Sequence, residues 1–341
     1  MKKFRLPGLI DVHVHLRDPG ATHKEDFESG SMAALAGGFT FIIDMPNNPT
    51  PTISKQALED KIKRSKKIAK MDIGFHFGTN GKNTDQFSKV WNNPNVFGLK
   101  LYCNHTTGEM LLEDLELLEK VFEAWKSSKP ILVHAEGIEL AAAIGLAHVY
   151  GRRLHVCHIS QAIEVELVRR AKKMKQKITA GVCPHHLWMT IDDVKTKGSL
   201  AMMKPPLGTS QDQAALWQGL RDGTIDIVET DHAPHTLSEK KSEKPPFGVP
   251  GLETALGLIL KGVQEKRIPL SKVKTILYTN PKKIFKIPTQ PKTYIEVDMS
   301  KTWRVGEKGY ESKCGWSPFD GWKLPGSLQK VVYKGKVVID S

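Results

Sequence analysis

Residues 9–16 have the sequence Leu9-Ile10-Asp11-Val12-His13-Val14-His15-Leu16. This short apolar run predicts a buried β-strand, and an amphipathic stretch with helical spacing follows it. The same alternation of a short apolar segment with a longer amphipathic one continues along most of the chain. The predicted strands cover residues 9–16, 39–45, 73–77, 96–103, 131–134, 154–159, 178–183 and 225–230.

Helices are predicted between these strands, although the gap at residues 85–91 is short and only weakly helical. Regular alternation of strands and helices implies a parallel sheet with right-handed crossovers. Eight such repeats close into an α/β (β/α)8 barrel of the TIM type. An open doubly wound sheet is the alternative, but no Gly-x-Gly-x-x-Gly follows the first strand. The amphipathic stretches cover residues 24–36, 55–70, 111–125, 138–150, 161–175 and 211–220.

The alternation of strand and helix patterns stops after Pro288. Residues 294–297 and 331–339 have the character of antiparallel strands, and a segment rich in Trp and Gly joins them. Because this part is too short to fold alone, we expect it to pack on the barrel. The sequence therefore predicts a barrel domain over residues 1–287 and a small C-terminal β appendage over residues 288–341.

The composition is that of an ordinary globular protein. Of the 341 residues, 40% are hydrophobic and 26% are charged, which excludes wholesale disorder. The net charge is +13, but the basic runs contain no interleaved aromatic residues, so no nucleic-acid binding is expected. No apolar run reaches the roughly 18 residues of a membrane span. Four cysteines without a Cys-x-x-Cys pair fit a reducing, cytoplasmic setting.

Polar residues occur in or just beyond the C-terminal halves of five predicted strands. That end of the barrel is where barrel enzymes carry their active sites. A lone histidine there is more often a satisfied core residue, and a lone aspartate is more often a helix cap or a turn residue. Six such polar residues at the ends of five strands of one predicted barrel are together hard to explain as packing. They are His13, His15, Lys100, His134, His158 and Asp231.

The residue types indicate a metal centre. His13 and His15 alternate along one strand, so both imidazoles face one side, where they suit a divalent metal such as zinc. Lys100 lies in an otherwise apolar strand, where a buried ammonium is unfavourable. A neutral lysine amine can capture carbon dioxide as a carbamate, and the two carbamate oxygens can bridge two cations. The alternative is a lysine that extends to solvent from the strand end.

Several longer motifs carry a family resemblance. They include Met45-Pro46-Asn47, Gly98-Leu99-Lys100-Leu101-Tyr102, Pro184-His185-His186-Leu187 and Asp231-His232-Ala233-Pro234-His235-Thr236, together with residues 6–17, 133–136, 156–158 and 250–254. With these motifs in family order over nearly its whole length, the chain resembles the dihydroorotases of the amidohydrolase superfamily. The resemblance is strongest to the dihydroorotase domain of the animal multifunctional pyrimidine-synthesis polypeptide.

The resemblance implies a reaction and a metal site. The reaction is the reversible cyclisation of N-carbamoyl-L-aspartate to L-dihydroorotate in pyrimidine biosynthesis, through a hydroxide that bridges two zinc ions. One zinc would be held by His13, His15 and Asp231, and the other by His134 and His158. Carboxylated Lys100 would bridge them. Asp231 would also act as the general acid and base.

The resemblance also implies the residues that hold the substrate. Arg17, two residues after His15, would share the inward face of the strand and bind the α-carboxylate; the alternative is a surface ion pair with Asp18 or Glu25. Asn47 would contact the substrate or merely shape its turn. Lys204 replaces an arginine, and Thr107 replaces the aromatic residue of a mobile loop. The remaining implied residues are His235, Gly248 and, as the catalytic residue of that loop, Thr106.

A third zinc is put in doubt by one departure from the family pattern. In the family, a glutamate and a cysteine matching Cys157 help to hold this extra ion. Gly181 stands where that glutamate would be, and glycine has no side chain to ligate a metal. The sequence therefore predicts two zinc ions and leaves the third site open.

Two other functions are alternatives to the dihydroorotase reaction. A hydantoinase or dihydropyrimidinase type of cyclic amidase is disfavoured by Arg17, because its substrates lack the carboxylate. A non-catalytic domain that only scaffolds aspartate transcarbamoylase is disfavoured because all six ligand positions are filled. The short segment before Ile10 suggests a domain flanked by carbamoyl-phosphate synthetase and aspartate transcarbamoylase, or a free enzyme that recruits such partners. A homodimer is expected.

Overall fold

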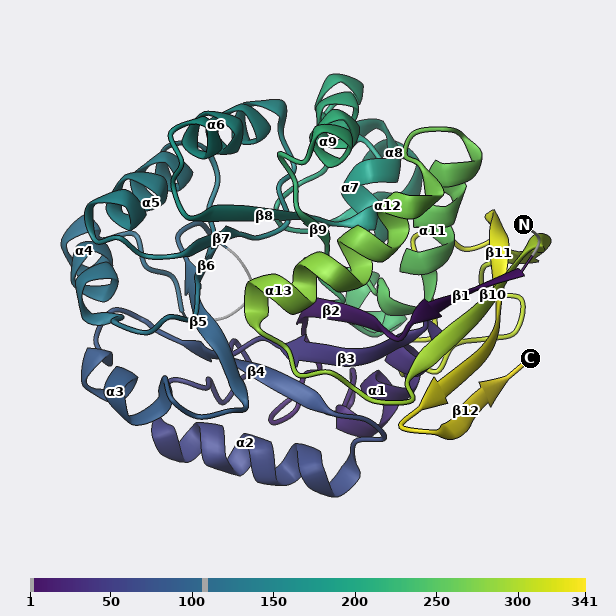
Figure 1. Ribbon diagram of the computed structural model, residues 1–341, viewed down its shortest axis with the longest axis horizontal. Coiled ribbons are helices and arrows are strands. Elements are labelled where there is room, and N and C mark those ends of the chain that lie inside the picture. Colours follow the sequence, from purple (N-terminus) through teal and green to yellow (C-terminus); the bar gives the residue numbers. More distant parts are fainter. Residues whose placement is uncertain (1–2, 106–109) are drawn as a thin grey trace.

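Eight parallel strands form the centre of the fold in the computed structural model, which describes residues 3–105 and 110–341. The strand order β2-β3-β4-β5-β6-β7-β8-β9 follows the sequence, and a parallel bridge between Val14 and His232 joins the first strand to the segment after the last. The helices lie around the outside of this barrel (Figure 1). The predicted (β/α)8 class is confirmed.

The barrel strands lie close to their predicted places. Their bounds are β2 Leu9–Val14, β3 Phe39–Asp44, β4 Ile73–Gly78, β5 Val96–Tyr102, β6 Ile131–His134, β7 Leu154–Val156, β8 Ile178–Val182 and β9 Ile227–Val228. Strands β2, β7 and β9 end two or three residues before their predicted ends, and β3, β5 and β8 end one residue early. Arg17, His158 and Asp231, which follow β2, β7 and β9, have left-handed φ angles of 59°, 35° and 46°. Of these three residues, only His158 was predicted to lie within its strand.

The helices fill the gaps between strands as predicted. Those of the first part of the chain are α1 Phe27–Ala36, α2 Lys55–Ile68, a 3-10 turn Thr84–Gln86 with α3 Phe87–Val90, α4 Leu115–Ala124, α5 Gly137–Val149 and α6 Ala162–Lys173. The later ones are α7 Pro184–Trp188, α8 Ile191–Lys197, a 3-10 turn Gly198–Ala201, α9 Ser210–Asp222, α10 Leu237–Lys240, α11 Leu252–Gln264, α12 Leu270–Lys274, a π-helical turn Thr275–Thr279 and α13 Asn280–Phe285. Of these later ones, only α9 was predicted.

A second sheet of four antiparallel strands lies beside the barrel. Its order is β1-β10-β11-β12, with β1 Lys3–Pro7, β10 Tyr294–Arg304, β11 Lys323–Tyr333 and β12 Lys336–Asp340. The prediction of a C-terminal β appendage is confirmed, but residues 331–339 form the end of β11, a turn and β12 instead of one strand. Strand β1 was not predicted, and Figure 1 shows it beside the yellow strands. The domain boundary after residue 287 stays a prediction.

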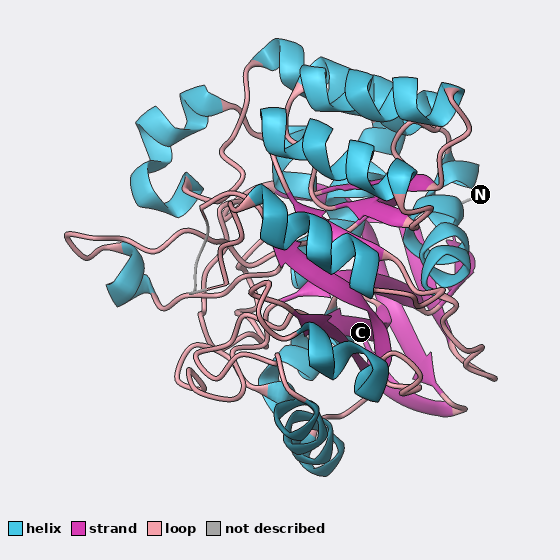
Figure 2. Ribbon diagram, turned by 90° about the vertical axis from the view of Figure 1, so that its left-hand side faces the viewer, coloured by secondary structure: helices cyan, strands magenta, loops and turns pink. Residues whose placement is uncertain are grey.

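Apolar side chains close the N-terminal end of the barrel. Inside the barrel, Ile10, Val12 and Phe41 belong to a buried cluster that also contains Ile284 and Phe285 of α13. Burial of each such side chain contributes about 1.5–3 kcal/mol to stability. Long loops gather on one side of the strands, on the left in Figure 2. With one end filled by α13, the polar residues lie at the other end, where these loops meet.

The cysteines and the helices bear on two expectations drawn from the composition. All four cysteines, Cys103, Cys157, Cys183 and Cys314, are free and buried. Among the residues that the structure describes, no helix has the length and apolar character needed to cross a membrane.

Candidate metal centre and substrate pocket

His13, His15 and Asp231 form the first ligand set. Asp231 Oδ1 lies 3.0 Å from His15 Nε2 and 3.4 Å from His13 Nε2. Nitrogen and oxygen ligands about 2.0–2.1 Å from one zinc ion stand about 3.3 Å apart at the tetrahedral angle. The three side chains could therefore hold one divalent cation with little movement.

His134 and His158 form the second ligand set. His134 Nδ1 faces His158 Nε2 at 3.1 Å, again close to the separation of two ligands on one metal. The two rings cannot both donate along this line, but two lone pairs can converge on a cation between them. His158 also lies near the first set, with its ring centroid 4.9 Å from that of His13. The two sets are thus neighbours in one site.

Lys100 lies at the same site and is fully buried. Its Nζ donates to Cys157 Sγ at 3.2 Å and lies 4.9 Å from the centre of the Tyr102 ring. Among the described residues, no carboxylate forms an ion pair with it. A buried ammonium without a counter-charge is unfavourable. These surroundings fit the carbamate predicted for Lys100, whose negative charge two cations would balance.

The charge state of both ligand sets suits metal binding. Burial lowers the pKa of His15 to about 4 and lowers the pKa values of His134 and His158 well below their usual range. These imidazoles are therefore neutral near pH 7, as metal ligands must be. Burial alone would raise the pKa of Asp231, but its electrostatic interaction with His13 and its hydrogen bond with His15 lower this pKa below its ordinary value. Asp231 is accordingly a carboxylate.

Neighbouring polar groups fix the orientation of the ligands. Asn47 Oδ1 lies 2.8 Å from His15 Nδ1, so an N–H at Nδ1 in the metal-bound protein would leave the Nε2 lone pair available to a cation held together with Asp231. Asp11 accepts hydrogen bonds from the backbone N–H of His13 and from both the N–H and the hydroxyl of Thr230. It thereby links the first ligand strand to the residue before Asp231.

Four of the five predicted substrate residues line one hollow with five of the six predicted metal ligands, whereas His235 and Lys100 are not among its lining residues. It has a volume of about 360 Å³ and is bounded by Arg17, Asn47, Lys204 and Gly248, with Ala233, Asp231 and the four histidines. Gly248 has a φ of 127°, and a Cβ there would lie 2.7 Å from the carbonyl oxygen of Ala233. Only glycine therefore lets the backbone pass this close to the hollow. Thr106 and Thr107 lie outside the described residues.

Arg17 points into the hollow, although not by extending strand β2. Its Nε donates to the Pro234 carbonyl at 3.1 Å, and its Nη2 lies 3.0 Å from His235 Nε2. The surface ion pair with Asp18 or Glu25 is not formed, since Asp18 pairs with Arg64 instead. His235 therefore contacts Arg17, whose side chain reaches from the segment after β2 to the loop after β9.

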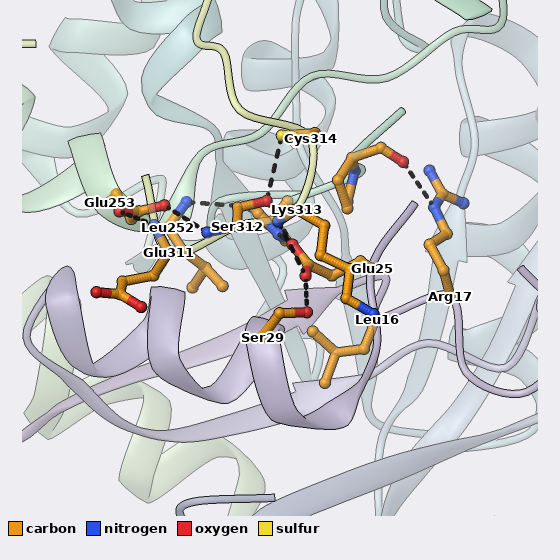
Figure 3. A network of polar contacts seen from close by, with 12 residues as sticks. Leu16, Arg17, Glu25, Ser29, Leu252, Glu253, Glu311, Ser312, Lys313 and Cys314 are labelled. Atoms are coloured by element: carbon orange, nitrogen blue, oxygen red, sulfur yellow. Dashed lines mark hydrogen bonds and ion pairs between the residues drawn. The ribbon is translucent and has the colours of Figure 1, made fainter. Parts of the chain in front are cut away.

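The C-terminal segment supports this loop. Figure 3 shows Glu25 accepting hydrogen bonds from Ser29, Ser312 and the backbone N–H of Lys313. Trp316 Nε1 donates to the His235 carbonyl at 2.7 Å. The residues beyond the barrel thus help to place the side chains around the hollow.

Three residues of the site were not predicted from the sequence. Tyr102 and Phe247 line the hollow, and the Tyr102 hydroxyl is buried without a hydrogen-bond partner among the described residues. Glu229 is fully buried beside His13 and Cys157. It could have been found by the same signal that singled out Lys100, because it is a charged residue at the end of a strongly apolar segment.

Comparisons with known proteins agree with this geometry. The model of the Amidohydrolase family matches residues 4–243. "Multifunctional protein pyr1-3" of Dictyostelium discoideum is 42% identical over 338 residues, which cover 98% of this chain but only 15% of that protein. "Dihydroorotase" of Pyrococcus abyssi is 32% identical over 355 residues, which cover 99% of this chain and 84% of that protein.

Solved structures show the same fold. An L-hydantoinase (dihydropyrimidinase) from Arthrobacter aurescens superposes with a TM-score of 0.94 at 26% identity, covering 99% of this chain and 86% of that one. The inactive dihydroorotase-like domain of the CAD-like multifunctional protein of Chaetomium thermophilum gives 0.84 at 27% identity, covering 99% and 95%. These structural relatives differ in activity, so the side chains of the site must distinguish the functions.

Proposed function

The chain belongs to the amidohydrolase family and to the dihydroorotases within it, and we propose that it catalyses the reversible ring closure of N-carbamoyl-L-aspartate to L-dihydroorotate. The observation that carries this proposal is the position of Arg17. Its guanidinium lines the same hollow as His13, His15, His134, His158 and Asp231. A buried cation a short distance from a metal centre is suited to a substrate that has a carboxylate beside the reacting amide.

The two ligand sets would hold two zinc ions, and Lys100 would bridge them as its carbamate. When bound, the two cations would supply a strongly nucleophilic water and polarise the amide carbonyl. The fit rests on the spacing of the ligand atoms, on neutral buried imidazoles and on a lysine without a counter-charge. Within the described residues, His134 Nε2 and His158 Nδ1 have no hydrogen-bond partner, although Glu136 Oε1 lies 4.0 Å from His134 Nε2.

The residues of the chain have separate tasks. Arg17 would bind the α-carboxylate of either substrate, and His235 would hold the guanidinium in place. Asp231 would accept a proton in ring opening and return it to the leaving ring nitrogen, then run in reverse during ring closure. Lys204, whose Nζ lies 5.1 Å from the Phe247 ring centre, would add positive charge at the mouth of the hollow. The catalytic function of Thr106 in the predicted mobile loop stays a prediction.

Two other functions are less well supported. A hydantoinase-type amidase has no need of Arg17 in the hollow. A scaffold domain without activity has no need of six ligand residues brought together. The proposed partners are carbamoyl-phosphate synthetase and aspartate transcarbamoylase, as domains or subunits, because a multifunctional relative matches 98% of the chain. A homodimer and a cytoplasmic location stay predictions.

The direct test is an assay of the purified chain with zinc present. Ring closure of N-carbamoyl-L-aspartate, followed by the ultraviolet absorbance of dihydroorotate, should proceed at a rate well above the same solution without protein. Absence of turnover in both directions, from folded protein that holds its metal, would refute the proposed activity.

Replacement of Arg17 by alanine should lower kcat/KM for both substrates, because both contain the α-carboxylate. Loss of one or two charge-assisted hydrogen bonds, at about 1.5–3 kcal/mol each, corresponds to roughly 10–10³-fold or more. Arg17→Lys is the matched control: it keeps the charge without the bidentate fork and should fall between wild type and Arg17→Ala. Unchanged dihydroorotate kinetics in Arg17→Ala would favour the hydantoinase-type function instead.

The two directions should respond oppositely to pH. Ring closure requires the protonated β-carboxyl of N-carbamoyl-L-aspartate as the electrophile, whereas ring opening requires an ionised Asp231 and a deprotonated nucleophile. We expect ring closure to be favoured at mildly acid pH and ring opening at alkaline pH. Initial rates against pH in each direction test this, and two identical profiles would contradict the assigned proton transfers.

A further inference from the structure

A third group of metal-ligand side chains lies next to the two-metal centre. His13, Cys157 and Glu229 each have a ligand atom within 4.8 Å of those of the other two, and all three residues are buried. His13 belongs to both sites, because its Nε2 faces Asp231 while its Nδ1 lies 3.7 Å from Glu229 Oε2. That Nδ1 is buried and has no hydrogen-bond partner among the described residues. It is therefore free to act as a ligand.

Glu229 occupies space that a side chain at position 181 would need. A Cβ on Gly181 of β8 would lie 2.4 Å from Glu229 Oε1, so the two positions cannot both carry a side chain without rearrangement. One carboxylate can be placed here, either from β8 or from the end of β9. In this chain the carboxylate comes from Glu229 at the end of β9, which was not predicted as a ligand from the sequence.

The Glu229 carboxylate is held toward the group by fixed neighbours. Its Oε1 accepts the backbone N–H of His158 at 2.6 Å, and its Oε2 lies 3.4 Å from His155 Nε2. These contacts give the Glu229 carboxylate a defined position.

Cys157 completes the group. Burial raises the pKa of its thiol to about 12, so without a cation it is protonated. A divalent cation deprotonates a coordinating thiol, and thiolate, carboxylate and imidazole together form a ligand set typical of zinc. The +2 charge of the cation would balance the thiolate and the carboxylate. His13, which would bind a cation with each of its two ring nitrogens, would have to release its N–H proton and carry a negative charge shared between the two sites. Lys100 Nζ, 3.2 Å from Cys157 Sγ, keeps one N–H for this contact after carboxylation.

We propose that Glu229 supplies, from the end of β9, the carboxylate ligand that position 181 lacks, so that with Cys157 and His13 it can hold the third divalent cation that the family resemblance implies. The inference rests on the proposed two-metal centre, because His13 is shared between the sites. It goes beyond that centre by assigning a function to Glu229 and by answering the doubt that Gly181 raised about a ligand set at Cys157.

The test measures metal content and the Cys157 thiolate, not catalysis. Protein purified without chelator should contain about three zinc ions per chain, and Glu229→Gln should reduce this to about two. In protein loaded with Co²⁺, wild type should show a thiolate-to-cobalt absorption band that Glu229→Gln and Cys157→Ser lack. Cys103→Ser is the matched control, because Cys103 is buried but belongs to none of the ligand groups.

A swap of the carboxylate gives the sharpest discrimination. Gly181→Glu combined with Glu229→Gly moves the acid from β9 to β8, and it should restore both the third metal equivalent and the cobalt band. X-ray absorption at the zinc edge of wild type should show a sulfur ligand at about 2.3 Å, and Cys157→Ser should remove it. A sulfur signal from the other cysteine-containing group, Cys183 with His185 and His186, would remain in that variant. Two zinc ions in wild type without a sulfur ligand would overturn this inference and leave the proposed function intact. Three ions without turnover would refute the proposed function alone.

Discussion

Lys100→Ala is expected to lose most of the bound metal and most of the activity. Both proposed cations depend on the carbamate of Lys100. Among the described residues, no Asp or Glu forms an ion pair with that lysine, so no neighbouring carboxylate can replace the carbamate. Loss of a group that only orients a metal ligand reduces affinity or activity by about 10–100-fold. Removal of a ligand shared by two metals should therefore exceed about 100-fold.

Metal analysis and rates measured on the same samples check this expectation. Added short carboxylic acids should restore part of the activity, because they can occupy the space of the missing side chain. Lys129→Ala is a suitable control, since Lys129 is a half-buried lysine whose Nζ donates to the Asn93 carbonyl, outside the metal-ligand groups. A Lys100→Ala protein that is fully active without additives would rule out the bridging function.

Asp231→Asn is expected to abolish turnover in both directions. General acid and base catalysis by a positioned group contributes about 10²–10⁴-fold, and an amide cannot accept and return the proton. Asparagine preserves the size of the side chain and one oxygen that can face His13 and His15. Loss of rate with metal retained would therefore identify the proton transfer, whereas loss of both would identify the ligand function. A decrease of less than tenfold would point to another base.

The barrel could be predicted from the sequence because its signals are local. Short apolar segments and amphipathic stretches recur along the chain, and polar residues such as His13 and Lys100 stand out against them. The strand ends were less accurate, since the left-handed conformations of Arg17, His158 and Asp231 have no clear local signature. Strained backbone of this kind concentrates at functional sites, and its position depends on the tertiary structure.

Long-range pairing explains what the sequence did not show. Strand β1 forms only by pairing with β10, almost 300 residues later, as in the register of Phe4 with Val297. Glu229 was overlooked for a similar reason: its importance arises from its approach to Gly181 on the neighbouring strand. The absence of a side chain at position 181 suggested a lost ligand, but only the three-dimensional structure shows which residue fills that space.

The measurement that tests the central claim most directly compares kcat/KM for ring opening of L-dihydroorotate with kcat/KM for dihydrouracil, which is the same ring without the carboxylate. If Arg17 binds that carboxylate beside the metal centre, kcat/KM of the zinc-loaded protein should be about 10–10³-fold higher for dihydroorotate, and Arg17→Ala should remove most of this difference. Equal rates, or a preference for dihydrouracil, would contradict the assignment of this chain as a dihydroorotase.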